Sequence, residues 1–337
     1  DERIDHVSLA EYFDGNNGAR LKMAPIARAA FGEAYAAEYG LELDQQSCLN
    51  FLFFAKADRR ARFLPFGVFS DERYHLVDGN DAIATGLRDS LAPAQLEYGM
   101  RLVRVRRRAD GAYEWTFENG GTTLTRVHDV VVIAIPFSVL RGVELDASLA
   151  LPGFKRIAID ELGYGTNAKQ MVGFRGRPWA ELGSVGVSYS DLQNHQNTWE
   201  TNPSRATAQQ AILTDYASGQ RGAALNPRAT QRETARFLAD LERVWPGAAG
   251  RALTDAAGKY IAHLEHWPSN PLTLGSYTCY RPGQFTRIAG NEAKPVGNLF
   301  FAGEHTNSFY DSQGFMEGAC LSGLAAAAAI LAQKNGV

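Results

Sequence analysis

Residues 298–329 contain the residues whose types and spacing suggest chemistry most directly. A short apolar strand runs into Ala302, Gly303 and Glu304, and a helix rich in small residues opens near Gly314. Glycine lets a backbone approach a bulky ligand, and a helix N-terminus directs free N–H groups and a positive dipole end toward negative charge. The pattern predicts a cofactor-binding strand, loop and helix, although an ordinary buried strand and a tightly packed helix have the same spacing.

The residues of this segment also resemble a known family. FAGEHT, GFMEGA and SGLAAA closely resemble the C-terminal flavin-binding signature of the FAD-dependent amine oxidases, the monoamine oxidase family. Similar pieces follow the family's order upstream, and the likeness covers most of the chain from about His75 onward: VVIAIPFSVL (131–140), LGYGTNAKQMVGF (162–174) and GSYTCYRPGQ (275–284). The resemblance implies an α/β fold of mixed α+β character, in which an incomplete Rossmann-like FAD-binding domain is interleaved with a substrate domain of mixed sheet and helices.

The sequence contains no glycine fingerprint G-x-G-x-x-G, which in this family lies near the N-terminus and binds the FAD pyrophosphate. The nearest approach, Gly163 and Gly165, lacks the third glycine. We therefore interpret the chain as the C-terminal portion of a longer flavoprotein, which leaves open a processed subunit, a truncated chain and a proteolytic fragment. A missing N-terminal segment or a second polypeptide would then carry the other half of the FAD site.

Three residues are candidates for catalysis through the family pattern. Lys169 matches the lysine that holds a water against flavin N5, where an ammonium would stabilise the anions formed as oxygen reoxidises the flavin. Tyr277 and Phe315 match the two parallel rings through which an amine approaches the flavin. The alternatives are a surface lysine at the end of a strand and two aromatic side chains of the core.

Further contacts with the cofactor are carried over by motif. Gly303 and Glu304 would lie beside the ribityl and phosphate portion, and the N–H of Met316 would face flavin O2 at the helix start near Gly314. Three more candidate cofactor contacts are Leu102, Trp267 and Ser276, although Trp267 is equally consistent with a buried structural tryptophan. Ser276 stands where some members carry a cysteine joined to the flavin, so we expect FAD to be bound noncovalently.

Composition excludes several other classes of protein. The chain has 337 residues, a net charge of −3 and 21% charged residues, which is typical of a soluble globular protein and argues against a nucleic-acid partner. The arginine-rich residues 101–108 are better interpreted as part of a strand pair with a solvated face. Three widely spaced cysteines indicate neither a disulfide framework nor a zinc site, and no apolar stretch reaches the length of a membrane span.

Four blocks of the chain have different patterns. Residues 1–70 read as helical, with a capping box at Ser8 and Glu11. The next block, 71–150, predicts a loop and helix, a hairpin turning at 109–111, and a buried strand that Pro136 ends. Block 151–269 alternates strands with helix-prone stretches at 207–217 and 233–244, and block 270–333 returns to the cofactor segment. We assign 1–70 and 151–269 to the substrate domain, and 71–150 and 270–333 to the FAD-binding domain.

The sequence thus predicts a flavin-dependent amine oxidase that passes a hydride from the α-carbon of an amine to FAD and electrons onward to oxygen. Two alternatives stay open: an amine dehydrogenase or desaturase with another electron acceptor, and a noncatalytic fragment of a parent oxidase. The substrate favoured is a primary or secondary monoamine. We expect a soluble protein, cytoplasmic by preference with periplasmic or secreted locations left open, and a homo-oligomer is possible.

Overall fold

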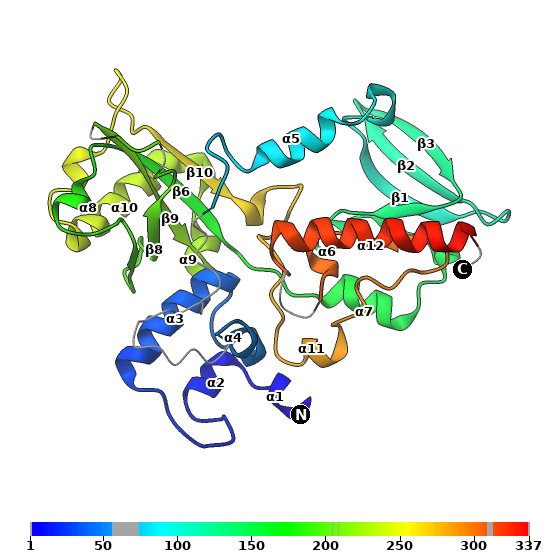
Figure 1. Ribbon diagram of the computed structural model, residues 1–337, viewed down its shortest axis with the longest axis horizontal. Helices are drawn as coiled ribbons and strands as arrows, with labels where there is room; N and C mark the ends of the chain where they lie inside the picture. The colour runs from blue at the N-terminus through cyan, green and yellow to red at the C-terminus, as the bar shows by residue number, and fades with distance from the viewer. Residues whose placement is uncertain (1, 56–73, 204, 208, 309–312, 336–337) are drawn as a thin grey trace. The chain divides into compact units, whose positions relative to one another are not determined.

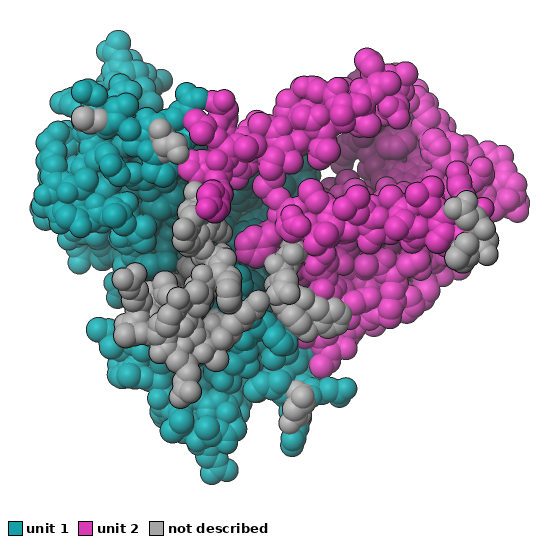
Figure 2. Space-filling view, in the orientation of Figure 1, with its two compact units in different colours: residues 1–72, 164–283 teal, residues 73–163, 284–337 magenta. Residues whose placement is uncertain are grey.

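Figure 1 shows the computed structural model of the chain, which describes residues 2–55, 74–203, 205–207, 209–308 and 313–335. The chain forms two compact units, coloured separately in Figure 2. Unit 1 comprises residues 1–72 and 164–283, and unit 2 comprises residues 73–163 and 284–337. The sequence predicted domain boundaries at residues 70, 150 and 269, and the two units of the structure divide after residues 72, 163 and 283. The assignment of one unit to the substrate and the other to FAD stays a prediction.

The N-terminal part of unit 1 is helical through residue 55: α1 (Glu2–Asp5), α2 (Leu9–Phe13), α3 (Pro25–Tyr39) and α4 (Cys48–Ala55). The predicted capping box is confirmed, because Ser8 Oγ accepts from the N–H of Glu11 and the Glu11 carboxylate accepts from the N–H of Ser8 at 2.9 Å. Phe51 packs edge-on against Phe13 and Tyr35, which joins α2, α3 and α4. Residues 56–70 of the expected helical block lie outside the described residues.

The rest of unit 1 is built around a five-stranded antiparallel sheet, with its strands in the order β10-β6-β9-β8-β7 (Figure 1). Its strands are β6 (Ala168–Arg175), β7 (Ser188–Tyr189), β8 (Asn197–Glu200), β9 (Gln210–Ala217) and β10 (Ala262–His266). The helices around it are α8 (Pro178–Glu181), α9 (Gly219–Ala224), η3 (Pro227–Ala229), α10 (Thr230–Val244), η4 (Ala249–Arg251) and η5 (Trp267–Ser269).

The two faces of this sheet differ because side chains alternate along each strand. One face carries Val172 and Leu213, which are fully buried and belong to the same core cluster as Phe237 and Leu241 of α10. The side chains between them, at residues 169, 199 and 216, belong to the opposite face. This alternation separates a packed core from the face that holds the candidate lysine.

One expected helix is wrong. Residues 207–217 read as helix-prone, but β9 occupies Gln210–Ala217 and pairs along its whole length with β6. The polar start of the segment concealed the alternation of Ile212, Thr214 and Tyr216 with buried neighbours, which is the period of a strand. The second expected helix, at 233–244, is confirmed within α10.

Unit 2 contains a four-stranded sheet in the order β3-β2-β1-β5 and a two-stranded parallel sheet of β4 and β11. Figure 1 labels β1, β2 and β3 of the larger sheet. The strands are β1 (Arg101–Arg107), β2 (Tyr113–Asn119), β3 (Thr122–His128), β4 (Val131–Ile133), β5 (Glu144–Leu145) and β11 (Leu299–Phe301). The hairpin predicted at 109–111 is confirmed between β1 and β2. Its solvated face is also confirmed, since Arg101 and Arg106 pair with Glu118 and Glu114 across the strands.

The helices of unit 2 are α5 (Asp81–Asp89), η1 (Pro93–Gln95), α6 (Phe137–Leu140), η2 (Ala147–Leu149), α7 (Gly153–Glu161), α11 (Gln284–Arg287), η6 (Glu304–Thr306) and α12 (Met316–Asn335). Over residues 316–334, α12 is long and apolar enough by composition to cross a membrane, a test that core helices of soluble proteins also pass. The sequence predicted no membrane span, and one helix among the described residues that passes a test of length and composition is weak evidence for one.

Gly40 offers a test of the packing behind the sheet. It ends α3 with φ +73°, and a Cβ there would collide with the Asn167 side chain and with the backbone of Gly165 and Thr166. Gly18 has nearly the same φ, +72°, and open space around it. We expect Gly40→Ala to lower the free energy of unfolding by about 3 kcal/mol, against about 1 kcal/mol for Gly18→Ala, as measured by urea denaturation. Equal losses would contradict this packing.

Candidate active site

Lys169 lies beside two aromatic rings, on the face of the unit 1 sheet opposite the packed core, which we call the open face. The pairing of β6 with β9 places it directly opposite Tyr216. Its Nζ lies 5.5 Å from the centre of the Tyr216 ring and 5.7 Å from that of Trp199. Both distances are within the range of cation–π attraction between an ammonium group and an aromatic ring.

Tyr277 is joined to the same group through hydroxyl contacts. The Tyr216 hydroxyl lies 3.1 Å from the Tyr277 hydroxyl, which in turn donates to the carbonyl oxygen of Glu38 at the end of α3. Burial raises the pKa of Tyr277 well above its usual range, and Tyr216 adds to this effect. Tyr277 therefore stays neutral and can act only through its ring and its hydroxyl group.

Ser276 is held by Asn167, which is fully buried. The Asn167 side-chain oxygen accepts from Ser276 Oγ, and its amide nitrogen donates to Ser218 Oγ at 2.8 Å and to the carbonyl of Ala37 at 2.7 Å. A Cβ on Gly165 would lie 2.6 Å from Ser276 Oγ. This glycine thus permits a close approach between chain segments.

His266 is the last residue of β10 in unit 1, and Trp267 follows it as the first residue of η5. The Trp267 carbonyl accepts from Thr273 Oγ1 at 2.8 Å within the turn that begins with η5. His266 is buried, with Nδ1 2.8 Å from Ser269 Oγ and Nε2 3.1 Å from the carbonyl of Gly222. Within the described residues there is no group of histidine, cysteine and carboxylate side chains suited to a metal ion.

The remaining predicted contacts lie in unit 2, around the turn from β11 to α12. Gly303 has φ +127°, and its N–H donates to Ser322 Oγ at 2.8 Å. The Glu304 carboxylate accepts from the N–H of Gly314 at 2.9 Å, which closes the loop between strand and helix. These two bonds connect the end of β11 to the loop and to α12.

Three other predicted residues of unit 2 are placed as follows. Phe315 is half-buried just before α12, and Met316 is exposed at its first turn. Leu102 is half-buried in β1, opposite Phe117 of β2. Because Phe315 and Tyr277 belong to different units, the ring pair predicted for them stays a prediction, as do the contacts of all these residues with a cofactor.

Lys155, a buried lysine next to the end of β11, was not indicated as a functional residue by the sequence. Lys155 of α7 is fully buried and donates to the carbonyl oxygens of Asn291 and Glu292 at 2.7 and 2.6 Å. Its Nζ lies 3.9 Å from the centre of the Phe301 ring. Burial lowers the pKa of Lys155 to about 7.

His305 shares this environment. Its ring lies edge-on to Phe137 at 4.4 Å, and burial, with a smaller effect of the Lys155 charge, lowers its pKa to about 3. His305 Nε2 has no hydrogen-bond partner among the described residues. The ring is therefore neutral at physiological pH, and one buried polar atom of the FAGEHT segment is left unsatisfied.

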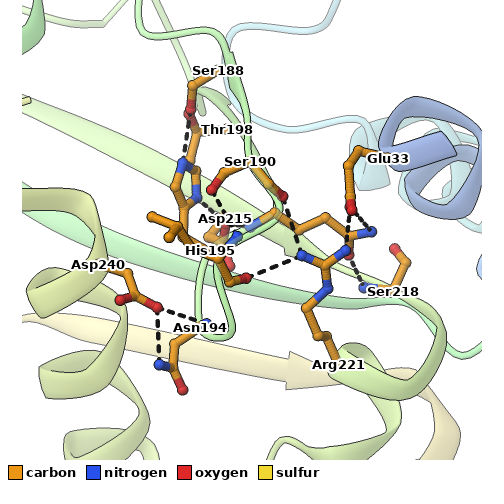
Figure 3. Close-up of polar contacts among 12 residues, drawn as sticks. Glu33, Ser188, Ser190, Asn194, His195, Thr198, Asp215, Ser218, Arg221 and Asp240 are labelled. Carbon is orange, nitrogen blue, oxygen red and sulfur yellow. Dashed lines mark hydrogen bonds and ion pairs between the residues drawn. The ribbon is translucent and has the colours of Figure 1, made fainter. Parts of the chain in front are cut away.

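Figure 3 shows a polar cluster on the core face of the unit 1 sheet. His195 lies 2.9 Å from Asp215 through Nδ1 and 3.0 Å from Ser188 Oγ through Nε2. Serine, histidine and aspartate in this order are the residues of hydrolytic triads. Here both His195 and Asp215 are buried, and Ser188 Oγ also lies 2.6 Å from Thr198 Oγ1, so we interpret the cluster as a structural link between β7, β8 and β9.

Tyr216 and Trp199 are site residues that the sequence pattern did not indicate. The reason is the helix expected at 207–217, which hid the position of Tyr216 opposite Lys169. The available signal was the alternation of residues 212, 214 and 216, since a strand pairing with β6 would place one of them beside the lysine.

Lys155 provides a test by its pH dependence. Because its pKa is lowered from 10.5 to about 7 on folding, the unfolded chain binds a proton that the folded chain releases between these values. The free energy of unfolding should therefore rise with pH across this window, by at most about 1.4 kcal/mol per pH unit. We expect Lys155→Met to lose this rise and Lys259→Met, at an exposed position, to keep it. Parallel pH profiles of wild type and Lys155→Met in urea denaturation would contradict the assignment.

Comparison with known proteins identifies the family. The family model described as flavin containing amine oxidoreductase matches residues 1–331. Polyamine oxidase 3 of Oryza sativa subsp. japonica is 30% identical over 263 residues, which cover 76% of this chain and 50% of that protein. Polyamine oxidase 2 of Arabidopsis thaliana is 28% identical over 261 residues, with the same two coverages. The chain therefore spans about half the length of these curated relatives.

Solved structures agree on the fold. Cyclohexylamine oxidase from Brevibacterium oxydans IH-35A matches with a TM-score of 0.73 at 18% identity, covering 98% of this chain and 69% of that one. The A394C mutant of putrescine oxidase matches with a TM-score of 0.77 at 17% identity, covering 98% and 68%. The chain belongs to the flavin containing amine oxidoreductase family, and its fold is the α/β fold of the monoamine oxidase-like flavoproteins.

Proposed function

We propose that this protein takes part in the flavin-dependent oxidation of an amine. The observation that carries the proposal is the placement of Lys169 and Tyr277, two residues of the family pattern, in one connected group on the open face of the unit 1 sheet. Bound FAD would supply a hydride acceptor for the carbon next to the amine nitrogen and would return the electrons to oxygen as hydrogen peroxide, while water hydrolyses the imine.

Residues of unit 2 fit such a cofactor. A Cβ at Gly303 would collide with the ring of His305, so only glycine keeps the backbone open at this strand end. The unsatisfied His305 Nε2 is a buried polar atom in the same segment. We propose that Gly303, Glu304, Gly314 and Met316 contact a noncovalently bound FAD, and that Leu102, Trp267 and Ser276 add further contacts. For covalent attachment, Ser276 offers no thiol, and burial raises the pKa of the Cys279 thiol, which disfavours the reactive thiolate.

The chain's own residues would align the amine and control charge. The neutral ring of Tyr277, with Phe315 as its proposed partner, would orient the α-carbon of the amine. The Lys169 ammonium would repel a protonated amine and favour the neutral form, from which hydride departs most easily. The same charge would stabilise the anions formed as oxygen is reduced.

For the substrate we propose a primary or secondary monoamine. Two aromatic rings and a lysine support an apolar, uncharged substrate better than a polycation. The names of the relatives supply the competing candidates, since they include polyamine oxidases and a putative L-amino-acid oxidase, YobN, of Bacillus subtilis (strain 168), which is 25% identical over 197 residues, or 58% of this chain and 39% of that protein. Oxygen consumption with a monoamine, a polyamine and an amino acid separates these candidates, and amine-dependent dye reduction without oxygen uptake would favour a dehydrogenase.

We also propose that a further chain segment or a second polypeptide completes the FAD site. A two-stranded parallel sheet such as β4 with β11 is too small to be independently stable, since parallel strands normally lie within larger, doubly covered sheets. A native mass spectrum of the purified protein should show FAD together with additional polypeptide mass. Tight FAD binding by the 36.8 kDa chain alone would contradict this part of the proposal.

Lys169→Met tests the proposed function directly. Without the ammonium, flavin reoxidation by oxygen should slow by about a hundredfold, while flavin reduction by the amine should change far less. Stopped-flow measurement of the two half-reactions separates these effects. Lys259→Met, which removes an exposed lysine of the same unit, is the matched control and should leave both rates unchanged. Equal slowing of both half-reactions by Lys169→Met would count against the role assigned to this lysine.

A further inference from the structure

We infer that Tyr216 is a positioning residue that couples Lys169 to Tyr277, and that the ring of Trp199 is the second aromatic ring that contacts the lysine. The inference rests on the proposed function for its kinetic consequences, but the contacts themselves are independent of any substrate.

The strand register brings the three side chains together on one face. Lys169 of β6 pairs with Tyr216 of β9, and Trp199 of β8 pairs with Thr214 of β9, so Trp199 and Tyr216 are diagonal neighbours. Their rings meet edge to face, with centres 5.4 Å apart and an interplanar angle of 72°. An ammonium group within 6 Å of both ring centres is held by two aromatic surfaces at once.

The direction of the hydroxyl contacts follows from proton counting. A tyrosine hydroxyl has a single proton, and Tyr277 gives its own to the carbonyl of Glu38. The Tyr277 oxygen must therefore accept from Tyr216, across 3.1 Å. Tyr277 is thus fixed at its hydroxyl end by a donor and an acceptor from two different elements, β9 and α3.

Tyr216 therefore has two separable functions. Its hydroxyl fixes the orientation of the Tyr277 ring, which the proposed reaction needs for binding and aligning an amine. Its ring holds the Lys169 ammonium, which the proposed reaction needs when oxygen is reduced. Removal of the hydroxyl alone should affect the first function, and removal of the whole ring should affect both.

Two variants of Tyr216 separate these functions. We expect Tyr216→Phe to raise KM for the amine about fivefold, the effect of one neutral hydrogen bond, with flavin reoxidation unchanged. Tyr216→Leu should also slow flavin reoxidation by at least about tenfold, because it removes a cation–π contact of a partly buried ammonium. Lys169→Met is expected to slow the same half-reaction. A purely structural role would lower stability without this separation of the two half-reactions.

Tyr12→Phe is the matched control. Tyr12 lies in unit 1, and its hydroxyl has no hydrogen bond within the described residues. The same chemical change at this position should alter neither KM nor reoxidation.

Fluorine NMR of protein labelled with 3-fluorotyrosine gives a readout that needs no turnover. The Tyr277 resonance, assigned by its loss in Tyr277→Phe, should shift in Tyr216→Phe and stay in place in Tyr12→Phe. An unshifted Tyr277 resonance together with a wild-type KM in Tyr216→Phe would overturn the inference. If the wild-type protein oxidises no amine, the proposed function fails, and the shift of the Tyr277 resonance alone then supports or overturns the coupling.

Discussion

The antiparallel register of β6 against β9 is the constraint on which the candidate site depends. It places Lys169 opposite Tyr216 and, one residue further along, Gln170 opposite Asp215. Because side chains alternate, the first pair belongs to the open face and the second to the core. A slip of β6 by one residue would turn Lys169 to the core face, where the buried polar cluster around His195 and Asp215 lies, and away from Trp199 and Tyr216.

Both faces of the sheet are needed for this arrangement. On the core face, Asp215 accepts from His195 and from the N–H of Gln196, whose side chain accepts from the N–H of Ser218. Ser218 in turn bonds to Asn167, which holds Ser276 beside Tyr277. A continuous set of buried hydrogen bonds therefore connects the interior of the sheet to the segment that carries the predicted ring, and such a network is costly to leave partly satisfied.

The sequence predicted the unit 2 loop, the capping box, the arginine-rich hairpin and the second long helix of unit 1, because each has a local signal of its own. Tyr216 and Trp199 escaped prediction because their role depends on strand pairing between distant segments, and the polar start of β9 imitated a helix. Lys155 escaped for a related reason, since a lysine in a short amphipathic helix reads as exposed until its partners at Asn291 and Glu292 are known. Family resemblance supplied Lys169 and Tyr277, and the fold joins the two through Tyr216.

Amine oxidation by this protein is tested most directly by an anaerobic titration of the purified flavoprotein with amines, followed by admission of oxygen, while the flavin absorbance is recorded. We expect a primary or secondary monoamine to bleach the flavin with one equivalent of amine per flavin, and oxygen to restore the absorbance with formation of hydrogen peroxide. A flavin that no amine bleaches would contradict amine oxidation at this site. A flavin that an amine bleaches but that stays bleached until an acceptor other than oxygen is added would contradict oxygen as the electron acceptor.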